Sequence, residues 1–284
     1  MLLKDLKSVY LGSLKELYSR QEAGNLFALA AEEVLGLTRQ DIHSNHSKDI
    51  PPESEKKMRT IAERLADGEP LQYILGFAHF YDLKIVVDRR VLIPRPETEY
   101  MVHMLLRDLR KRTPKKIIDL CTGSGCIALV LASHLPETSI SAMDISGKAL
   151  EVAEKNAAMA GCTVRLIRDD LLQPEYPYTQ YDCIVSNPPY IRKSEKEWMH
   201  RNVLDYEPHK ALFVEDKDPL SFYRAITDFG IEHLSQDGII WCEINENLGT
   251  ETAALFERRG YREVRILKDL NRKDRILKAK YQKQ

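Results

Sequence analysis

The stretch that decides the fold is Ile117-Ile118-Asp119-Leu120-Cys121-Thr122-Gly123-Ser124-Gly125-Cys126-Ile127-Ala128. Residues 117–121 are mostly apolar, as in a buried strand, and the glycines that follow allow a tight turn into a helix. The N-terminus of such a helix favours a negatively charged group. Gly123 and Gly125 fit the G-x-G-x-x-A dinucleotide fingerprint, which is weak when it stands alone. The order of strand, turn and helix strengthens it and predicts a nucleotide-type cofactor site.

The same alternation of strand and helix continues to the C-terminus. Further strands are predicted at 139–144, 164–167, 182–186, 238–244, 262–267 and 274–281, and helices at 127–135, 148–160, 219–234 and 250–259. This alternation predicts a mainly parallel sheet with helices on both faces, the doubly wound α/β fold. No helix separates the last two strands, so we expect one of them to be antiparallel.

The chain is predicted to divide into three parts. Apolar residues recur every three or four positions through residues 1–70, which predicts a small all-α bundle with helices that end at Gly36 and Gly68. Residues 71–95 hold two β-rich runs, 73–77 and 83–87, which predict a β-hairpin linker. Residues 96–284 form the α/β domain.

Composition excludes several classes of protein. The 284 residues include 42 Lys and Arg against 43 Asp and Glu, so no net charge draws the chain to nucleic acid or to anionic membranes. No apolar run is long enough for a transmembrane helix, and no signal peptide is expected. Five cysteines without C-x-x-C spacing and eight histidines without metal-ligand spacing predict neither disulfides nor a metal site. A reducing cytoplasm fits these features best.

Acidic residues near the turn indicate which cofactor binds. Asp144 lies nineteen residues after Gly125 at the end of the next strand, where its carboxylate can accept hydrogen bonds from ribose hydroxyls. Asp119, just before the turn, suits a cationic amino group better than a pyrophosphate. S-adenosylmethionine carries an ammonium, a carboxylate, a ribose and an adenine, and Asp170-Leu171 is predicted to line the adenine.

The reaction site is predicted at Asn187-Pro188-Pro189-Tyr190, directly after the strand at 182–186. The carboxyl ends of strands in a doubly wound sheet are where ligands bind. The two prolines fix the backbone and so the angle of the asparagine amide. Its oxygen and the carbonyl of the first proline can accept hydrogen bonds from a planar –NH₂ group, while the tyrosine ring offers a stacking face. This arrangement holds a conjugated nitrogen beside a methyl donor, so that positioning supplies most of the rate.

Several segments together resemble those of a known family. The class I S-adenosylmethionine-dependent methyltransferases that act on planar nitrogens have segments similar to Asp119-Leu120-Cys121-Thr122-Gly123-Ser124-Gly125, Asp144-Ile145-Ser146 and Ser186-Asn187-Pro188-Pro189-Tyr190. The HemK-type release-factor glutamine methyltransferases, a narrower group, have segments similar to Pro70-Leu71-Gln72-Tyr73-Ile74-Leu75-Gly76 and Leu92-Ile93-Pro94-Arg95-Pro96-Glu97-Thr98-Glu99.

The resemblance spans essentially the whole chain and implies a Rossmann-like, seven-stranded, mostly parallel sheet. It implies N5-methylation of the glutamine in the Gly-Gly-Gln motif of class-one peptide chain release factors. Separately, we expect the protein to act as a monomer in the cytoplasm, and its helical bundle, which carries no recognisable chemistry, to recognise the protein substrate. The resemblance also extends the cofactor site to Cys121, Thr122, Ser124 and Asn187. Family members often have glycine in place of Cys121, and Leu171 matches an adenine-contacting position that is sometimes aromatic.

Three other functions are alternatives, and the weakest is a nicotinamide-dependent oxidoreductase, which would leave the Asn187-Pro188-Pro189-Tyr190 segment unexplained. An N-methyltransferase that acts on an exocyclic amino group of a nucleic-acid base would use the same tetrapeptide, but the near-neutral charge and the acidic N-terminal region do not favour direct nucleic-acid binding. The 27 C-terminal residues, 258–284, carry 11 Lys and Arg against three acids and favour it mildly. A catalytically silent binding module would have no need to keep the glycine turn, Asp144 and Asn187 together.

Overall fold

The structure is a computed structural model that describes residues 1–44, 47–110 and 114–282. The chain forms two compact units. Residues 1–76 and 200–206 make up the smaller unit, and residues 77–199 and 207–284 make up the larger one. The short segment 200–206, far along the sequence, therefore belongs with the N-terminal residues. Among the described residues, no helix combines the length and the apolar character that a bilayer span requires.

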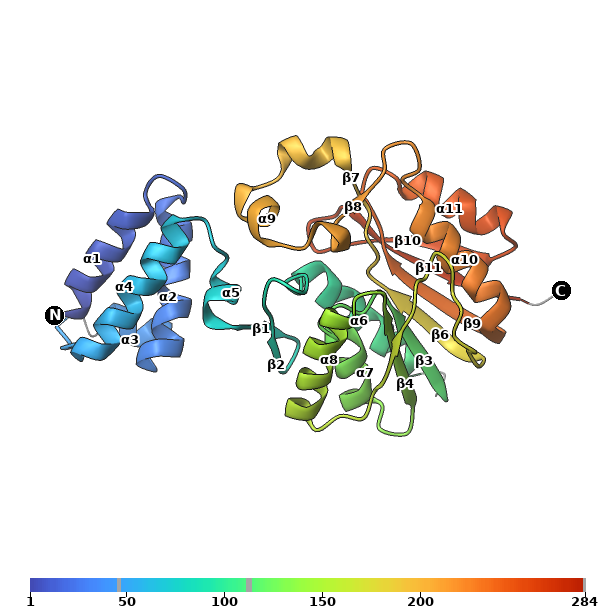
Figure 1. Cartoon of the computed structure of the whole chain (residues 1–284), viewed down its shortest axis with the longest axis horizontal. Coiled ribbons are helices and arrows are strands. Elements are labelled where there is room, and N and C mark those ends of the chain that lie inside the picture. Colours follow the sequence, from blue (N-terminus) through green and yellow to red (C-terminus); the bar gives the residue numbers. More distant parts are fainter. Residues whose placement is uncertain (45–46, 111–113, 283–284) are drawn as a thin grey trace. The chain divides into compact units, whose positions relative to one another are not determined.

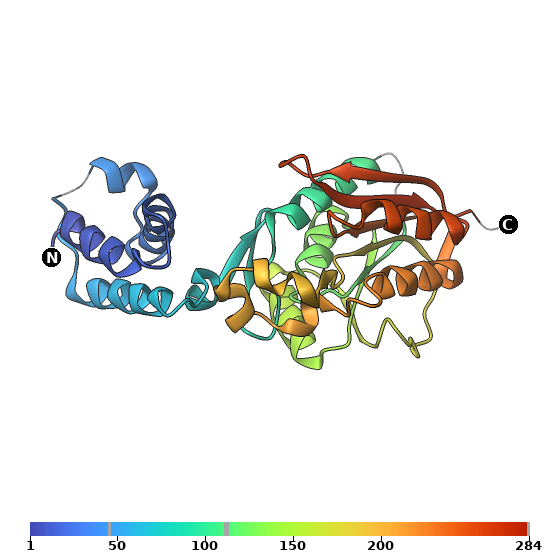
Figure 2. The same cartoon turned by 90° about the horizontal axis from the view of Figure 1, so that it is seen from above.

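The smaller unit is helical, as predicted. Its helices are α1 (Leu3–Leu14), α2 (Arg20–Leu35), α3 (Arg39–Ser44), α4 (Pro52–Ala66), α5 (Leu71–Leu75) and α9 (Arg201–Tyr206). Helices α1, α2 and α4 contact one another (Figures 1 and 2). In the core of this unit the rings of Tyr10 and Phe27 meet edge to face, with their centroids 5.2 Å apart. The Ser19 hydroxyl caps the start of α2, and Gly36 ends it with a left-handed φ of 62°.

The hairpin is confirmed, but its first strand begins later than predicted. The first strand was predicted to begin at residue 73. Residues 71–75 form the short helix α5 instead. Pro70 precedes that helix and Gly76, with φ of 81°, ends it, so the flanking residues favour one helical turn over an extended run. Strands β1 (Phe77–Phe80) and β2 (Leu83–Val86) then pair antiparallel.

The larger unit contains the predicted seven-stranded sheet. Its strands are β3 (Lys116–Leu120), β4 (Ser139–Asp144), β5 (Arg165–Arg168), β6 (Tyr181–Ser186), β9 (Leu234–Glu243), β10 (Arg262–Lys268) and β11 (Asp274–Lys280). They lie in the order β10-β11-β9-β6-β3-β4-β5 (Figure 1). Strand β11 is antiparallel to both of its neighbours, and the central pairs are parallel, which confirms the expected topology.

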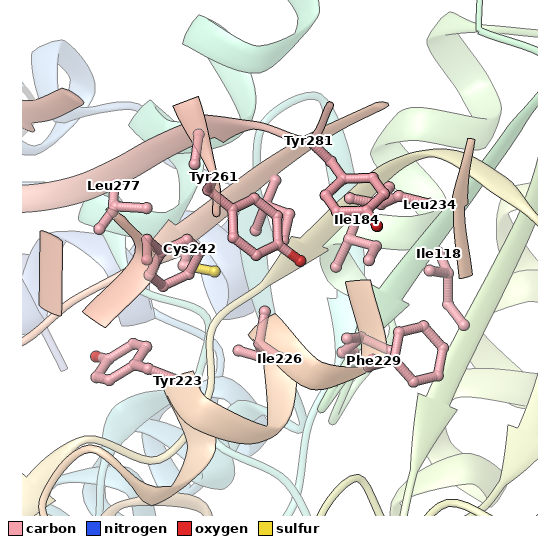
Figure 3. Packing of buried hydrophobic residues seen from close by; sticks show 14 of the residues in the cluster. Ile118, Ile184, Tyr223, Ile226, Phe229, Leu234, Cys242, Tyr261, Leu277 and Tyr281 are labelled. Carbon is pink, nitrogen blue, oxygen red and sulfur yellow. The ribbon is translucent and has the colours of Figure 1, made fainter. Parts of the chain in front are cut away.

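Helices cover this sheet in two groups. Helices α6 (Pro96–Leu109), α7 (Cys126–His134) and α8 (Gly147–Ala160) form one group, and α10 (Ser221–His233) and α11 (Gly249–Arg258) form the other. Right-handed crossovers that run in opposite directions from the sheet centre place these groups on opposite faces. Figure 3 shows Ile226 and Phe229 of α10 on the side that faces Ile184 and Ile118 of the sheet, and Tyr223 of α10 below Cys242.

Some elements were not predicted. The α/β alternation was expected to begin after residue 96, and no helix was predicted before its first strand. The structure has helix α6 there. The region between β6 and α10 contains β7 (Ile191–Arg192), the 3₁₀ helices η1 (Lys193–Trp198) and η2 (His209–Ala211), and β8 (Phe213–Val214). Strands β7 and β8 pair in parallel as a separate two-stranded sheet.

The strand order fixes where a ligand site belongs. From β3 the chain moves outward through β4 to β5, and then returns to place β6 on the other side of β3. The carboxyl ends of β3 and β6 therefore flank the topological switch point, which is the usual ligand site of doubly wound sheets. The predicted cofactor and reaction segments follow these two strands.

Candidate functional site

The glycine turn connects β3 to α7 with an unusual backbone. Gly123 and Gly125 have φ of 56° and 81°, values that side chains rarely tolerate. A Cβ at Gly125 would lie 3.1 Å from the Cβ of Ala153, so α8 packs closely against the turn, whereas a Cβ at Gly123 would meet nothing within 4 Å. Gly125 is thus needed for packing and Gly123 leaves open space beside the turn.

Asn156 holds this turn and was not identified from the sequence. The side chain lies in α8 and is 1% exposed. Its Nδ2 donates to the carbonyl oxygens of Ser124, at 2.9 Å, and Val86, at 3.0 Å, and its Oδ1 accepts from the Val86 amide at 2.7 Å. One buried amide therefore ties the turn to strand β2, a link between segments that no local sequence pattern indicates.

Asp119 is buried at the end of β3 and is only partly satisfied. Its side chain is fully buried, and Oδ2 accepts a hydrogen bond from the Thr122 hydroxyl, whereas Oδ1 has no hydrogen-bond partner in the described structure. Burial raises the pKa of Asp119 to about 7, although the Thr122 hydroxyl and the Ala128 amide favour its charged form. A buried carboxylate oxygen without a donor could accept a hydrogen bond from a cationic ligand, and the predicted contact of Asp119 with the ammonium of S-adenosylmethionine stays a prediction.

Asp144 ends β4 beside the same turn. Its Oδ2 accepts from the Gly123 amide at 2.8 Å, and its Oδ1 accepts from the Ser146 amide at 2.9 Å. Burial raises the pKa of Asp144, and these two amides oppose that shift. The structure thus gives Asp144 a role in holding the turn, and its predicted contact with ribose hydroxyls stays a prediction.

Cys121 occupies a position suited to glycine. Its φ is 61°, in the left-handed region, although its side chain carries a Cβ. The side chain packs against the sheet core, and burial raises the pKa of its thiol well above the usual value. The backbone therefore has a glycine-like conformation at this residue.

Asp170 and Leu171 follow β5. Leu171 is only 4% exposed and belongs to the hydrophobic core cluster, and the Asp170 carboxylate accepts from the Leu172 amide at 2.9 Å. The neighbouring Asp169 accepts from the amides of Glu175 and Tyr176, which fixes the loop. The contact of Asp170 and Leu171 with an adenine stays a prediction.

The Asn187–Tyr190 segment lies beside the glycine turn because strands β6 and β3 are linked at their ends. The Ser186 hydroxyl donates to the carbonyl oxygen of Leu120 at 2.7 Å. Pro188 and Pro189 are buried, whereas Asn187 and Tyr190 are partly exposed. The predicted reaction segment and cofactor turn are therefore neighbours at one edge of the sheet.

Two further polar residues reach the reaction segment and were missed from the sequence. Asn187 Nδ2 donates to Thr98 Oγ1 at 2.9 Å, and the Tyr190 hydroxyl donates to Glu243 Oε1 at 2.7 Å. Thr98 lies in the proline-rich segment 92–99, and Glu243 is a single acid that ends an apolar strand. The sequence held a signal for each of them. Thr98 lies in a segment that was already singled out, and Glu243 lies at the same edge of the sheet as the predicted site.

The charges in the site favour a cationic ligand. Asp119, Asp144 and Glu243 are acidic and largely or fully buried, and burial raises the pKa of each. A cation brought among them favours their ionised forms. Within residues 1–44, 47–110 and 114–282, no group of three or more His, Cys, Asp or Glu side chains could hold a metal ion.

Six of the eleven basic residues in the C-terminal segment 258–284 have acidic partners. Ion pairs join Arg259 to Asp228, Lys268 to Asp274, Lys273 and Arg275 to Glu246, Lys278 to Asp108, and Lys280 to Asp237. Basic side chains that contact phosphates displace the counterions condensed on the nucleic acid, and a side chain already held in an ion pair is less available for this contact. These pairs therefore do not favour the segment as a nucleic-acid site.

Comparisons with known proteins match both units. The family model of the PrmC N-terminal domain matches residues 13–76, and that of the methyltransferase small domain matches residues 97–205. The release factor glutamine methyltransferase of Flavobacterium psychrophilum is 38% identical over 99% of this chain and 100% of its own length. That of Bacteroides thetaiotaomicron is 40% identical over 94% of this chain and 96% of its own.

A solved structure supports the fold. The hMettl16 catalytic domain, in complex with the MAT2A 3'UTR hairpin 1, aligns with a TM-score of 0.57 over 90% of each chain. Its sequence identity of 16% means that this likeness concerns the fold alone.

Proposed function

The chain belongs to the release factor glutamine methyltransferase family, and from that premise we propose that the edge formed by the carboxyl ends of β3, β4 and β6 is its active site. The reaction moves a methyl group from S-adenosylmethionine to the side-chain amide nitrogen of a glutamine in a peptide chain release factor. The observation that carries the assignment of the site is the Ser186–Leu120 hydrogen bond, which sets Asn187 beside the glycine turn.

The residues at β3 and β4 fit the cofactor. S-adenosylmethionine supplies an activated methyl group on a sulfonium. Asp119 Oδ1, buried and without a partner in the described structure, would accept the ammonium, and the amides of the turn at Gly123 would face the carboxylate. Asp144 would take the ribose, and Asp170 with Leu171 would lie along the adenine.

The Asn187–Tyr190 segment would hold the substrate amide. An amide nitrogen is a weak nucleophile because its lone pair is conjugated with the carbonyl. We expect the side-chain oxygen of Asn187 and the carbonyl oxygen of Pro188 to accept both amide hydrogens, which turns the nitrogen toward the methyl group. Pro189 keeps the segment rigid, and the Tyr190 ring bounds the site. Positioning of this kind can contribute several orders of magnitude in rate.

Substitution of Asn187 by alanine tests the site. We expect Asn187→Ala to lower kcat about 10²-fold, because the substrate amide loses an acceptor and can rotate. The affinity for S-adenosylmethionine, measured by calorimetry, should change much less. Normal kcat with a raised KM would show that Asn187 supplies only uniform binding. Wild-type turnover would remove Asn187 from the active site.

A substrate competition tests the assignment of the methyl acceptor. The protein is incubated with labelled methyl donor and a mixture of release factor, tRNA, rRNA and DNA. We expect label on the release factor, at the glutamine of the Gly-Gly-Gln motif. Label on nucleic acid and none on protein would contradict the assignment.

We also propose that the enzyme acts as a monomer in the cytoplasm without direct nucleic-acid binding. The residues of the candidate site all belong to the larger unit, the five cysteines are free, and six basic residues of the C-terminal segment have acidic partners. The helical unit would recognise the release factor. Sedimentation of the purified protein, alone and with its substrate, tests the stoichiometry.

A further inference from the structure

A single buried carboxylate is linked to both ends of the Asn187–Tyr190 segment. Asn187 Nδ2 donates to Thr98 Oγ1 at 2.9 Å, and Thr98 Oγ1 donates to Glu243 Oε2 at 2.6 Å. The other oxygen, Glu243 Oε1, accepts from the Tyr190 hydroxyl at 2.7 Å. Helix α6 supplies Thr98 and strand β9 supplies Glu243, so three separate elements meet at this group.

The network is shielded from water. Thr98 is 2% exposed and Glu243 is 1% exposed. Burial raises the pKa of Glu243, while the hydrogen bonds from Thr98 and Tyr190 and the charge of Arg275 favour its ionised form. A buried carboxylate is stable only with such partners, so its presence here needs an explanation beyond packing.

When Glu243 is ionised, as the donors Thr98 and Tyr190 and the charge of Arg275 favour, the hydrogen bonds have one consistent direction. An ionised carboxylate accepts and cannot donate, so the one hydroxyl hydrogen of Thr98 is committed to Glu243. The Thr98 oxygen then has only lone pairs left, and Asn187 must present its –NH₂ group to it. The amide oxygen of Asn187 consequently lies on the opposite side of its amide group.

We propose that Glu243 and Thr98 are positioning residues that set the orientation of the Asn187 side-chain amide, so that its oxygen accepts from the substrate –NH₂. This inference rests on the proposed function of Asn187. Were the amide turned over, its own –NH₂ would face the substrate –NH₂, and two donors would meet without an acceptor. The bond from Tyr190 to the same carboxylate anchors the far end of the segment, so one group aligns the whole tetrapeptide.

Substitutions of Thr98 test this relay. Thr98→Val keeps the shape and removes the hydroxyl, which frees the Asn187 amide to turn over. We expect kcat for the release factor to fall about ten-fold or more. The change in KM should be much smaller, because the Thr98 hydroxyl aligns the bound substrate through Asn187 and does not itself bind it. Thr98→Ser restores the hydroxyl and should recover kcat to within roughly three-fold.

A matched control separates this effect from buried packing. Thr252 in α11 is also fully buried, and its hydroxyl donates at 2.6 Å to the carbonyl of Leu248, the residue that precedes the helix. Thr252→Val makes the same chemical change outside the site. We expect it to keep wild-type kcat and to lower Tm less than Thr98→Val does, because it leaves no buried carboxylate oxygen without a donor.

Glu243→Gln gives a second, nearly isosteric test. A glutamine amide can donate to the Thr98 oxygen, and Thr98 could then donate to the Asn187 oxygen, so the direction of the chain is no longer fixed. We expect a loss in kcat similar to that of Thr98→Val. The double variant should lose little more than either single one, because both changes release the same group.

The outcomes distinguish this inference from the proposed function. If the wild-type protein does not methylate a release factor, the proposed function is wrong. If it does, and both Thr98→Val and Glu243→Gln keep wild-type kcat, the relay is wrong although the function stands. A kcat loss that Thr98→Ser does not recover would also overturn it, since the hydroxyl would then not be the group that matters. If Thr98→Val does not fold, the Glu243→Gln kinetics decide.

Discussion

At the scale of single residues, Asp119 should make cofactor binding depend on pH. Its pKa of about 7 means that it is largely protonated below neutrality in the ligand-free protein. An ammonium ligand needs the ionised form, so affinity for S-adenosylmethionine should rise with pH toward 7. From about pH 5.5 to about pH 6.5 the expected gain is roughly eight-fold, which calorimetry can measure.

The ligand-free protein should show the opposite dependence. A carboxyl whose folded pKa lies above its ordinary value of 3.8 binds protons more tightly when folded. Its contribution to the free energy of unfolding is therefore present below about pH 4 and is lost as pH rises through about 7. Asp119→Asn should remove both dependences. If the affinity of Asp119→Asn for S-adenosylmethionine still depended on pH in the same way, another titratable group would be responsible.

The backbone conformation of Cys121 limits which side chains this position can tolerate. Because its φ is 61°, a β-branched side chain should fit poorly there. We expect Cys121→Val to lower the free energy of unfolding by about 1–3 kcal/mol. Cys162 is partly exposed and is not among the residues with positive φ, so Cys162→Val is the control. Equal effects in denaturant unfolding would contradict a backbone origin.

At the scale of elements, the two glycines of the β3–α7 turn should respond differently to alanine. Both substitutions strain a left-handed backbone, which costs about 1 kcal/mol. Only Gly125→Ala adds a close contact with Ala153 in α8, so it should be the less stable variant in thermal unfolding. Gly123→Ala places its methyl group in open space beside the turn and should mainly weaken cofactor binding. The reverse ranking would contradict the packing argument.

The regular elements of the sheet could be predicted from the sequence because their periodicity is strong. Apolar strands alternate with amphipathic helices from residue 116 onward, and each predicted strand there is present. The elements at 191–214 were missed because two-residue strands and 3₁₀ turns carry no periodic pattern. Residues 73–75 were wrongly assigned to a strand because β-forming side chains hid the effect of Pro70 and Gly76 at the two ends.

The candidate site was only partly predictable for a related reason. Asp119, Asp144 and Asn187 each follow a recognisable strand, so their convergence follows from topology. The partners that orient them do not, because Thr98 and Glu243 are 145 residues apart in sequence, and Asn156 and Val86 are 70 apart. Hydrogen bonds over such separations depend on side-chain placement that no local pattern encodes.

At the scale of the whole molecule, the segment 200–206 should depend on the N-terminal residues. It belongs to the smaller unit, where the Tyr206 hydroxyl donates to the Asp67 carbonyl at 3.1 Å. We expect deletion of residues 1–76 to leave cofactor affinity nearly unchanged, to expose 200–206 to proteolysis, and to lower methylation of intact release factor sharply. Unchanged kcat/KM in a folded truncated protein would give the helical unit another role.

Because residues 200–206 belong to the smaller unit, they also affect how chimeras between related enzymes should be designed. The chain enters and leaves the smaller unit at 76–77, 199–200 and 206–207, so no single cut separates the two units. A chimera that takes only the N-terminal residues of a relative would combine a foreign bundle with a native α9. Exchange of both segments together should give the better-expressed hybrid, and substrate preference should then follow the donor of the pair.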